Sequence, residues 1–173
     1  MKILVMYSSL TGNTKKVAEA ITAALPEEST LVQVADKLPI QNYDIVFLGF
    51  WIDRSSADNA MAQFMQQMHD ENVALFATLG AYPNTAYAKK CMENAVALLP
   101  KDNTVLGKFH CQGKLAEKLV EKFKTLPPEH PHALTPERLM RYQKAASHPD
   151  EVDLKAVAQF AIKVREEFIN KHH

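Results

Sequence analysis

The sequence predicts an α/β fold in which helices cover both faces of a five-stranded parallel sheet, forming a three-layer sandwich. Apolar, β-branched runs alternate along the chain with segments whose apolar residues recur at helical spacing. Two of the runs, 44–49 and 73–79, are almost continuously hydrophobic, as expected for central parallel strands that are buried on both faces. The 173 residues, 47% of them hydrophobic, can fill one sizeable core but not two, so residues 1–173 are expected to form a single domain.

The expected elements follow in chain order. Strands are predicted at residues 2–7, 30–35, 44–49, 73–79 and 103–110. The three helices between them present apolar stripes, which are Val17, Ile21, Ala24 and Leu25, then Met61, Phe64, Met65 and Met68, then Met92, Ala95, Val96 and Leu99. Each stripe is expected to pack on one face of the sheet.

Residues 113–149 interrupt this alternation. A helical stretch at 114–123 carries its apolar residues on one side, and a segment with four prolines follows at 126–136. Thr135 as N-cap and Pro136 in the first turn then predict a second helix. We interpret 113–149 as a helical insertion before the last helix, which is expected from about residue 152 to 168.

The composition excludes several classes of function. Lys plus Arg and Asp plus Glu each total 20, so no net field attracts nucleic acid or an anionic membrane. No apolar run reaches the roughly 18 residues that a membrane span needs, and the start of the chain is typical of a first strand, not of a signal peptide. Cys91 and Cys111 lack ligand spacing, and the histidines at 129–132 and at the C-terminus lack partners, so no metal site is expected. A cytoplasmic protein with reduced thiols is predicted.

The loop at residues 8–14, with the sequence SSLTGNT, joins the first strand to the first helix. Six of its seven positions are glycine or can form hydrogen bonds, whereas a plain capping turn, the alternative interpretation, needs one such residue. Such a loop gathers backbone N–H groups and the positive end of a helix dipole around one point, and Gly12 permits close approach. The expected ligand is a phosphate. The Walker A, GxGxxG and phosphatase cysteine patterns are absent.

Ser9-Leu10-Thr11-Gly12-Asn13-Thr14 after a first strand resembles the phosphate loop of the flavodoxin family, which commonly reads S/T-x-T-G-N-T. The sequence is also similar to a flavodoxin subgroup with GFW-[IV]-D and TLGAYP segments. The resemblance covers residues 1–112 and the last helix. It implies a flavodoxin-like sandwich with strand order 2-1-3-4-5 and FMN as the cofactor. The residues implied to hold its phosphate are Ser8, Ser9, Leu10, Thr11, Gly12, Asn13 and Thr14.

The same resemblance implies that the loops after the third and fourth strands hold the isoalloxazine ring of FMN. The residues implied there are Phe50, Trp51, Ile52 and Asp53, together with Thr78, Leu79, Gly80, Ala81 and Tyr82. Tyr82 is the favoured stacking residue, Trp51 either stacks on the ring or belongs to the core, and Tyr87 is expected to serve packing.

Two departures from the family pattern bear on the site. Flavodoxins are commonly acidic, whereas this chain has no net charge. Many members have a glycine in the loop after the third strand, and residues 50–59 contain none. A left-handed conformation at Asp53, Arg54 or Ser55 is therefore expected to cost roughly 1 kcal/mol or more.

Three functions remain open from the sequence. The first is an FMN-binding electron carrier, a monomer or weak dimer that accepts electrons from a reductase and passes them to a redox enzyme. The second is an FMN-dependent reductase that acts directly on a quinone- or tetrapyrrole-like substrate, with the 113–149 insertion as a lid or pocket wall. The third is a flavodoxin fold that binds without flavin. No catalytic side chain is assigned, because the chemistry belongs to the flavin.

Overall fold

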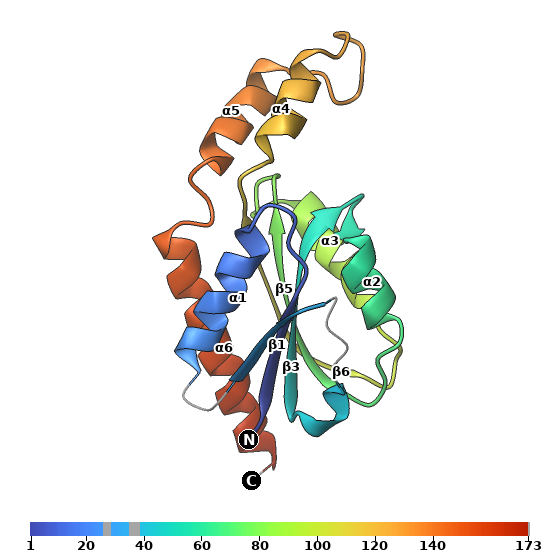
Figure 1. Ribbon diagram of the computed structural model, residues 1–173, viewed down its shortest axis with the longest axis vertical. Coiled ribbons are helices and arrows are strands. Elements are labelled where there is room, and N and C mark those ends of the chain that lie inside the picture. Colours follow the sequence, from blue (N-terminus) through green and yellow to red (C-terminus); the bar gives the residue numbers. More distant parts are fainter. Residues whose placement is uncertain (26–28, 35–38, 173) are drawn as a thin grey trace.

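A computed structural model of the chain describes residues 1–25, 29–34 and 39–172, and its centre is a parallel sheet of the order β2-β1-β3-β5-β6 (Figure 1). These strands are β1 (Ile3–Tyr7), β2 (Ser29–Gln33), β3 (Ile45–Asp53), β5 (Asn72–Leu79) and β6 (Thr104–Gln112). They are the five predicted strands in the predicted order, so the flavodoxin-like α/β fold is confirmed. Ala35, at the end of the second predicted strand, lies outside the described residues.

A sixth strand, which the sequence had not predicted, is attached to β3. This strand, β4 (Ser56–Ala57), pairs antiparallel with the end of β3 and lies off the path of the parallel strands. Two residues are too few to show a period of apolar positions, so β4 cannot be predicted from an apolar pattern. The pair forms a tight hairpin at the carboxyl end of β3.

Helices cover both faces of the sheet, as the three-layer prediction requires (Figure 1). One face carries α1 (Asn13–Ala24) and α6 (Glu151–His172), and the other carries α2 (Asn59–Met65) and α3 (Ala86–Val96). Side chains of β1 alternate between the two cores, with Ile3 and Val5 on the α1 side and Leu4 and Met6 on the α2 side. All four are fully buried, so the sheet separates two apolar cores.

The insertion forms a helical hairpin of α4 (Glu117–Lys124) and α5 (Pro136–Ala145), which projects beyond the carboxyl ends of the strands (Figure 1). The Thr135 hydroxyl accepts a hydrogen bond from the Arg138 N–H at 3.2 Å, and Pro136 stands in the first turn, so the predicted start of this helix is confirmed. At its base the two connecting segments are joined, because the Lys114 N–H donates to the His148 carbonyl at 2.9 Å.

Side chains of α1 attach this hairpin to the body of the protein. The Asn13 side-chain amide donates to the Lys114 carbonyl at 2.7 Å, and the Lys16 ammonium donates to the Pro149 carbonyl at 2.8 Å. The hairpin is therefore held over the loop that precedes α1. Within the described part of the chain, no helix has both the length and the apolar character needed to cross a membrane.

Gly49 in β3 leaves room for the ring of Phe76 on the neighbouring strand β5, and its replacement provides a test of this core. A Cβ atom at Gly49 would lie 2.1 Å from Cζ of Phe76, a fully buried ring on β5 that has no space to move. We expect Gly49→Ala to lower the free energy of unfolding by about 3 kcal/mol in denaturant titration. Gly107→Ala is the matched control, expected to cost about 1 kcal/mol, because its Cβ meets the half-buried Phe160 ring at 2.9 Å. Equal losses in the two variants would contradict this packing argument.

Candidate functional site

The carboxyl ends of β1, β3 and β5 open into one cavity of about 190 Å³ beneath the hairpin. Parallel pairing aligns Tyr7 with Gly49 and Trp51 with Thr78, so the loops that leave these strands converge. The predicted site residues that line the cavity are Ser9, Leu10, Thr11, Asn13, Thr14, Trp51, Ile52, Thr78, Leu79 and Gly80. The structure thus brings together residues from all three predicted segments.

The N-terminus of α1 differs from those of α2, α3 and α5 in lacking a side-chain cap. Asp58, Thr85 and Thr135 cap those three helices, whereas Gly12 precedes α1 with a φ of 91° and no side chain to offer. The first amides of a helix have no acceptor within it, and the first turn of α1 contains no acidic residue. These N–H groups and the helix dipole therefore favour an anion at this end of the cavity.

Hydroxyl groups of the loop fall into two classes. Ser8 is buried and donates to the carboxylate of Asp58 at 2.8 Å, and the Thr14 hydroxyl is buried in a 2.9 Å hydrogen bond with that of Thr78. The Ser9 hydroxyl accepts from the Gly12 N–H at 3.1 Å, which fixes the turn, while Thr11 is exposed at the cavity. Ser8 does not line this cavity, so its hydroxyl serves the fold.

The segment after β3 divides between core and cavity. Phe50 is fully buried in the core on the α2 side, where it continues the alternation of Val46 and Leu48. It does not line the cavity. Trp51 and Ile52 line the first cavity, and Trp51 is half-buried there. Asp53 pairs with Ser56 in the β-hairpin of β3 and β4 and also lies outside the lining of the cavity. The structure therefore brings two of the four predicted residues of this segment to the site.

The hairpin between β3 and β4 turns through a left-handed conformation, with φ of 48° at Arg54 and 63° at Ser55. Two positive φ angles are typical of tight hairpin turns that favour glycine or asparagine, so the turn has the conformation that the sequence predicts to be costly. Helix α3 supports it, because the Asn94 amide donates to the Ser55 carbonyl at 2.8 Å and the Ser55 hydroxyl donates to the Tyr87 oxygen at 3.3 Å.

A second cavity of about 510 Å³ adjoins the first, between the loop after β5 and the helical hairpin of α4 and α5. The predicted residues Ala81 and Tyr82 line it, together with Tyr87, for which packing was predicted. Five residues line both cavities, namely Ile52, Leu79, Gly80, Leu115 and Leu119. The two cavities therefore adjoin at Gly80, where an added Cβ would lie 2.5 Å from a methyl carbon of Leu115.

The insertion contributes site residues that the sequence reasoning did not assign. These are Gly113, Lys114, Leu115, Ala116 and Leu119, which line the first cavity. The apolar side of the predicted helix at 114–123 could have indicated them, because no element of the α/β pattern is expected to pack against that side. Lys114 is the one charged side chain among the described residues of this lining, and no acidic residue occurs there.

Thiol chemistry has no support near the site. Cys111 is buried at the end of β6, and burial raises the pKa of its thiol far above the ordinary range, with the nearby carboxylates of Asp153 and Asp150 adding to the effect. The group stays protonated at neutral pH and is no nucleophile.

The profile of the flavodoxin domain matches residues 4–162, which is most of the chain. The chain belongs to the flavodoxin domain family. It is 40% identical over 168 residues to the flavodoxin-like domain-containing protein BilS of Clostridioides difficile strain CD3, covering 93% of this chain and 94% of the relative. The BilS protein of Clostridium symbiosum strain WAL-14163 is 26% identical over 180 residues, which cover 94% of this chain and 95% of that protein.

Solved flavodoxin structures share the fold. A flavodoxin from the domain Archaea superposes with a TM-score of 0.58 at 17% identity, over 97% of this chain and 99% of that chain. A flavoprotein of Lactobacillus acidophilus NCFM, crystallised in complex with FMN, superposes with a TM-score of 0.51 at 21% identity, over 70% of this chain and 97% of that chain. These structures confirm the fold, and the match of the family profile together with the similarity to BilS confirms the family resemblance inferred from the sequence.

The residues of this flavodoxin domain fit FMN, the cofactor that family membership supports. The uncapped N-terminus of α1 suits a phosphate, and no described acidic side chain lines the first cavity to repel it. The mostly apolar walls formed by Ile52, Leu79 and Leu115 suit an aromatic ring system, and they continue into the second cavity.

The left-handed turn yields a stability prediction. We expect Arg54→Gly to raise the free energy of unfolding by about 0.5 to 1 kcal/mol, because glycine removes the steric cost of positive φ but loses more entropy on folding. Asp53→Gly, in the extended end of β3, is the control and is expected to lower stability by a similar amount. Denaturant titration of both variants measures the difference, and a loss of stability in Arg54→Gly would refute the assignment of strain.

Proposed function

We propose that this flavodoxin domain is an FMN-dependent electron carrier that accepts electrons from a reductase and passes them to a redox enzyme. The observation that carries the proposal is the convergence of the uncapped α1 N-terminus with the ends of β3 and β5 at one cavity. FMN when bound supplies transfer of one or two electrons, and the protein supplies binding, orientation and electrostatic surroundings.

The residues of the first cavity divide into two roles in this proposal. Thr11, Asn13 and the first amides of α1 would hold the phosphate, because they stand where the helix dipole favours negative charge. Trp51 and Gly80 would border the ring, with the aromatic face of Trp51 available for stacking. Tyr82, which lines the second cavity and is 38% exposed, would border the ring from the outer side.

Contact with partner proteins would occur at the mouth of the first cavity. Leu10 lines that cavity and is 69% exposed. An electron carrier needs an apolar edge where its cofactor approaches a partner, and Leu10 would supply one. With 20 basic and 20 acidic residues, the chain lacks the overall charge that would steer a strongly charged partner from a distance.

Removal of one phosphate donor tests the cofactor site. We expect Thr11→Ala to weaken FMN binding by about 1 to 3 kcal/mol, because a phosphate oxygen loses a charge-assisted hydrogen bond. Thr22→Ala is the matched control in the last turns of α1, where its hydroxyl donates to the Ala18 carbonyl and touches no cavity. Quenching of FMN fluorescence measures both affinities. Wild-type affinity in Thr11→Ala would remove this residue from the phosphate site.

A second function, direct reduction of a small quinone- or tetrapyrrole-like substrate, is favoured by the second cavity. A simple carrier needs no roofed space of about 510 Å³ beside its cofactor, whereas a reductase needs room for a substrate. Oxidation of NADPH or NADH by the FMN-loaded chain distinguishes the two, with a quinone acceptor present and no reductase added. Turnover under these conditions supports the reductase, and electron transfer only after addition of a reductase supports the carrier.

A further inference from the structure

We infer that the second cavity binds a small planar carboxylate, with the guanidinium of Arg141 pairing with the carboxylate and aromatic side chains stacking on its ring. The inference rests on the proposed function, because it makes this ligand a neighbour of the flavin. It goes further by naming the chemical class of the ligand and the residue that selects it. Arg141 lies on α5, within the insertion at residues 113–149.

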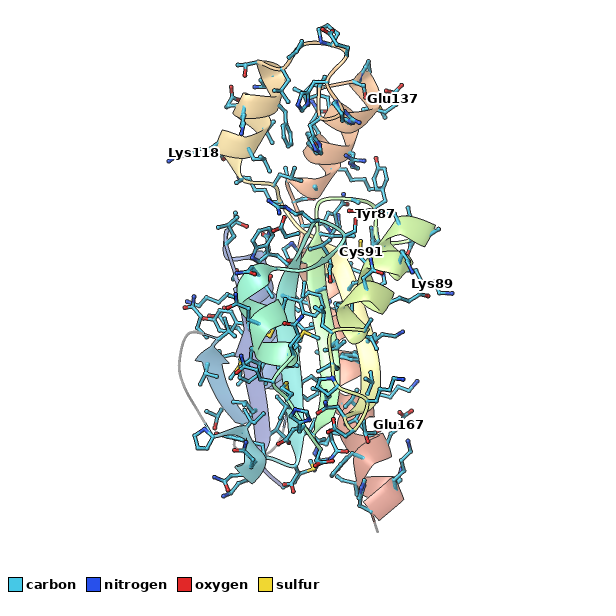
Figure 2. The ribbon with its side chains drawn as sticks, turned by 90° about the vertical axis from the view of Figure 1, so that its right-hand side faces the viewer. Tyr87, Lys89, Cys91, Lys118, Glu137 and Glu167 are labelled. Atoms are coloured by element: carbon cyan, nitrogen blue, oxygen red, sulfur yellow. The ribbon has the colours of Figure 1, made fainter. Side chains whose placement is uncertain are left out.

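The size and walls of the cavity suit a planar aromatic molecule. Its volume of about 510 Å³ lies in the range of small-molecule sites. Tyr82 and Tyr87 contribute from the body of the protein, and Figure 2 shows Tyr87 at the end of α3 nearest the hairpin. Phe123 and Tyr142 contribute from the hairpin, where their ring centroids lie 6.1 Å apart at an interplanar angle of 30°. Aromatic side chains contributed by both the body and the helical hairpin favour a flat ligand between them.

The charge of the cavity indicates an anion. Arg141 is half-buried, and its Nε atom is buried without a hydrogen-bond partner. Its guanidinium carbon lies 5.3 Å from the centre of the Tyr142 ring. No aspartate or glutamate occurs among the described residues that line this cavity, so the guanidinium has no carboxylate there. A cationic group that is partly withdrawn from water and has no carboxylate partner is unfavourable, and the planar fork of arginine matches a carboxylate.

Neighbouring charges outside the cavity leave this arrangement intact. Glu137 stands one turn before Arg141 on α5 and projects from the outside of the hairpin (Figure 2). Its carboxylate accepts hydrogen bonds from its own backbone N–H and from the Thr135 hydroxyl, which lower its pKa and hold it at the start of α5. Lys144 lies with its ammonium 5.8 Å from the centre of the Tyr82 ring, which adds positive charge beside the cavity.

The position of the cavity makes its ligand a neighbour of the flavin site. Both cavities share Ile52, Gly80 and Leu115 in their linings, so these residues form the border between them. A molecule held by Arg141 and Tyr142 would therefore approach a flavin ring that borders Gly80. The insertion thus selects the ligand, while the flavodoxin core holds the cofactor.

Binding of 2-naphthoate to the FMN-loaded protein tests the inference, measured by isothermal titration calorimetry. The neutral analogue 2-naphthalenemethanol has the same ring without the carboxylate. We expect naphthoate to bind about tenfold or more tightly than the alcohol, because a charge-assisted pair with Arg141 forms only with the acid. Arg141→Gln should abolish this preference and Arg141→Lys should restore part of it. Lys122→Gln, which removes a positive charge from α4 outside the cavity linings, should leave it unchanged.

Three results would overturn the inference. One is equal affinity for the acid and the alcohol in the wild-type protein. Another is an unchanged preference in a folded Arg141→Gln variant, with folding checked by circular dichroism. The third is binding of naphthoate to the FMN-free protein that is lost on loading with FMN, since the flavin ring would then fill the second cavity. Failure of the chain to bind FMN would refute the proposed function alone, because naphthoate binding to the FMN-free protein would still support the carboxylate site.

Discussion

Parallel pairing of β3 with β1 on one side and β5 on the other is the constraint on which the site depends. It ends three strands at one edge, with Tyr7 aligned to Gly49 and Trp51 aligned to Thr78. The loop before α1 then meets the segments after β3 and β5 around one cavity. Gly49 lies next to Phe76 in this pairing and leaves the space that the buried Phe76 ring occupies, so the packing of the core depends on the same strand pairing as the site.

The insertion depends on this arrangement and completes it. Asn13, the first residue of α1, holds the start of the hairpin through Lys114, and Leu115 packs on Gly80 at the end of β5. The same few residues thus border the proposed phosphate site, the proposed ring site and the base of the hairpin. This coupling gives the insertion a direct route to influence the cofactor, which a surface loop elsewhere on the sheet would lack.

Much of the fold was predictable because the relevant physics is local. Continuous apolar runs in β3 and β5 indicated central strands, and Thr135 with Pro136 indicated the start of α5. The strand β4 was missed because two residues carry no periodic pattern. The left-handed turn at Arg54 was predicted to be costly, and it forms because contacts from Asn94 and Tyr87, distant in sequence, support it.

The site was predictable in outline and not in detail. A hydroxyl-rich loop before a helix indicated an anion site, but the sequence could not show that Ser8 turns to Asp58 and Thr14 to Thr78. Those pairings depend on tertiary contacts. The insertion showed an apolar side without a partner, and only the structure places Leu115 and Arg141 at the cavities.

The most direct measurement of the central claim compares the affinities of the protein for FMN and riboflavin, which differ only in the phosphate. If the uncapped N-terminus of α1 binds that phosphate, two or more charge-assisted hydrogen bonds are lost with riboflavin. We therefore expect FMN to bind about 100-fold or more tightly than riboflavin. Equal affinity for the two flavins would contradict it, because the loop at residues 8–14 would then contribute nothing to cofactor binding.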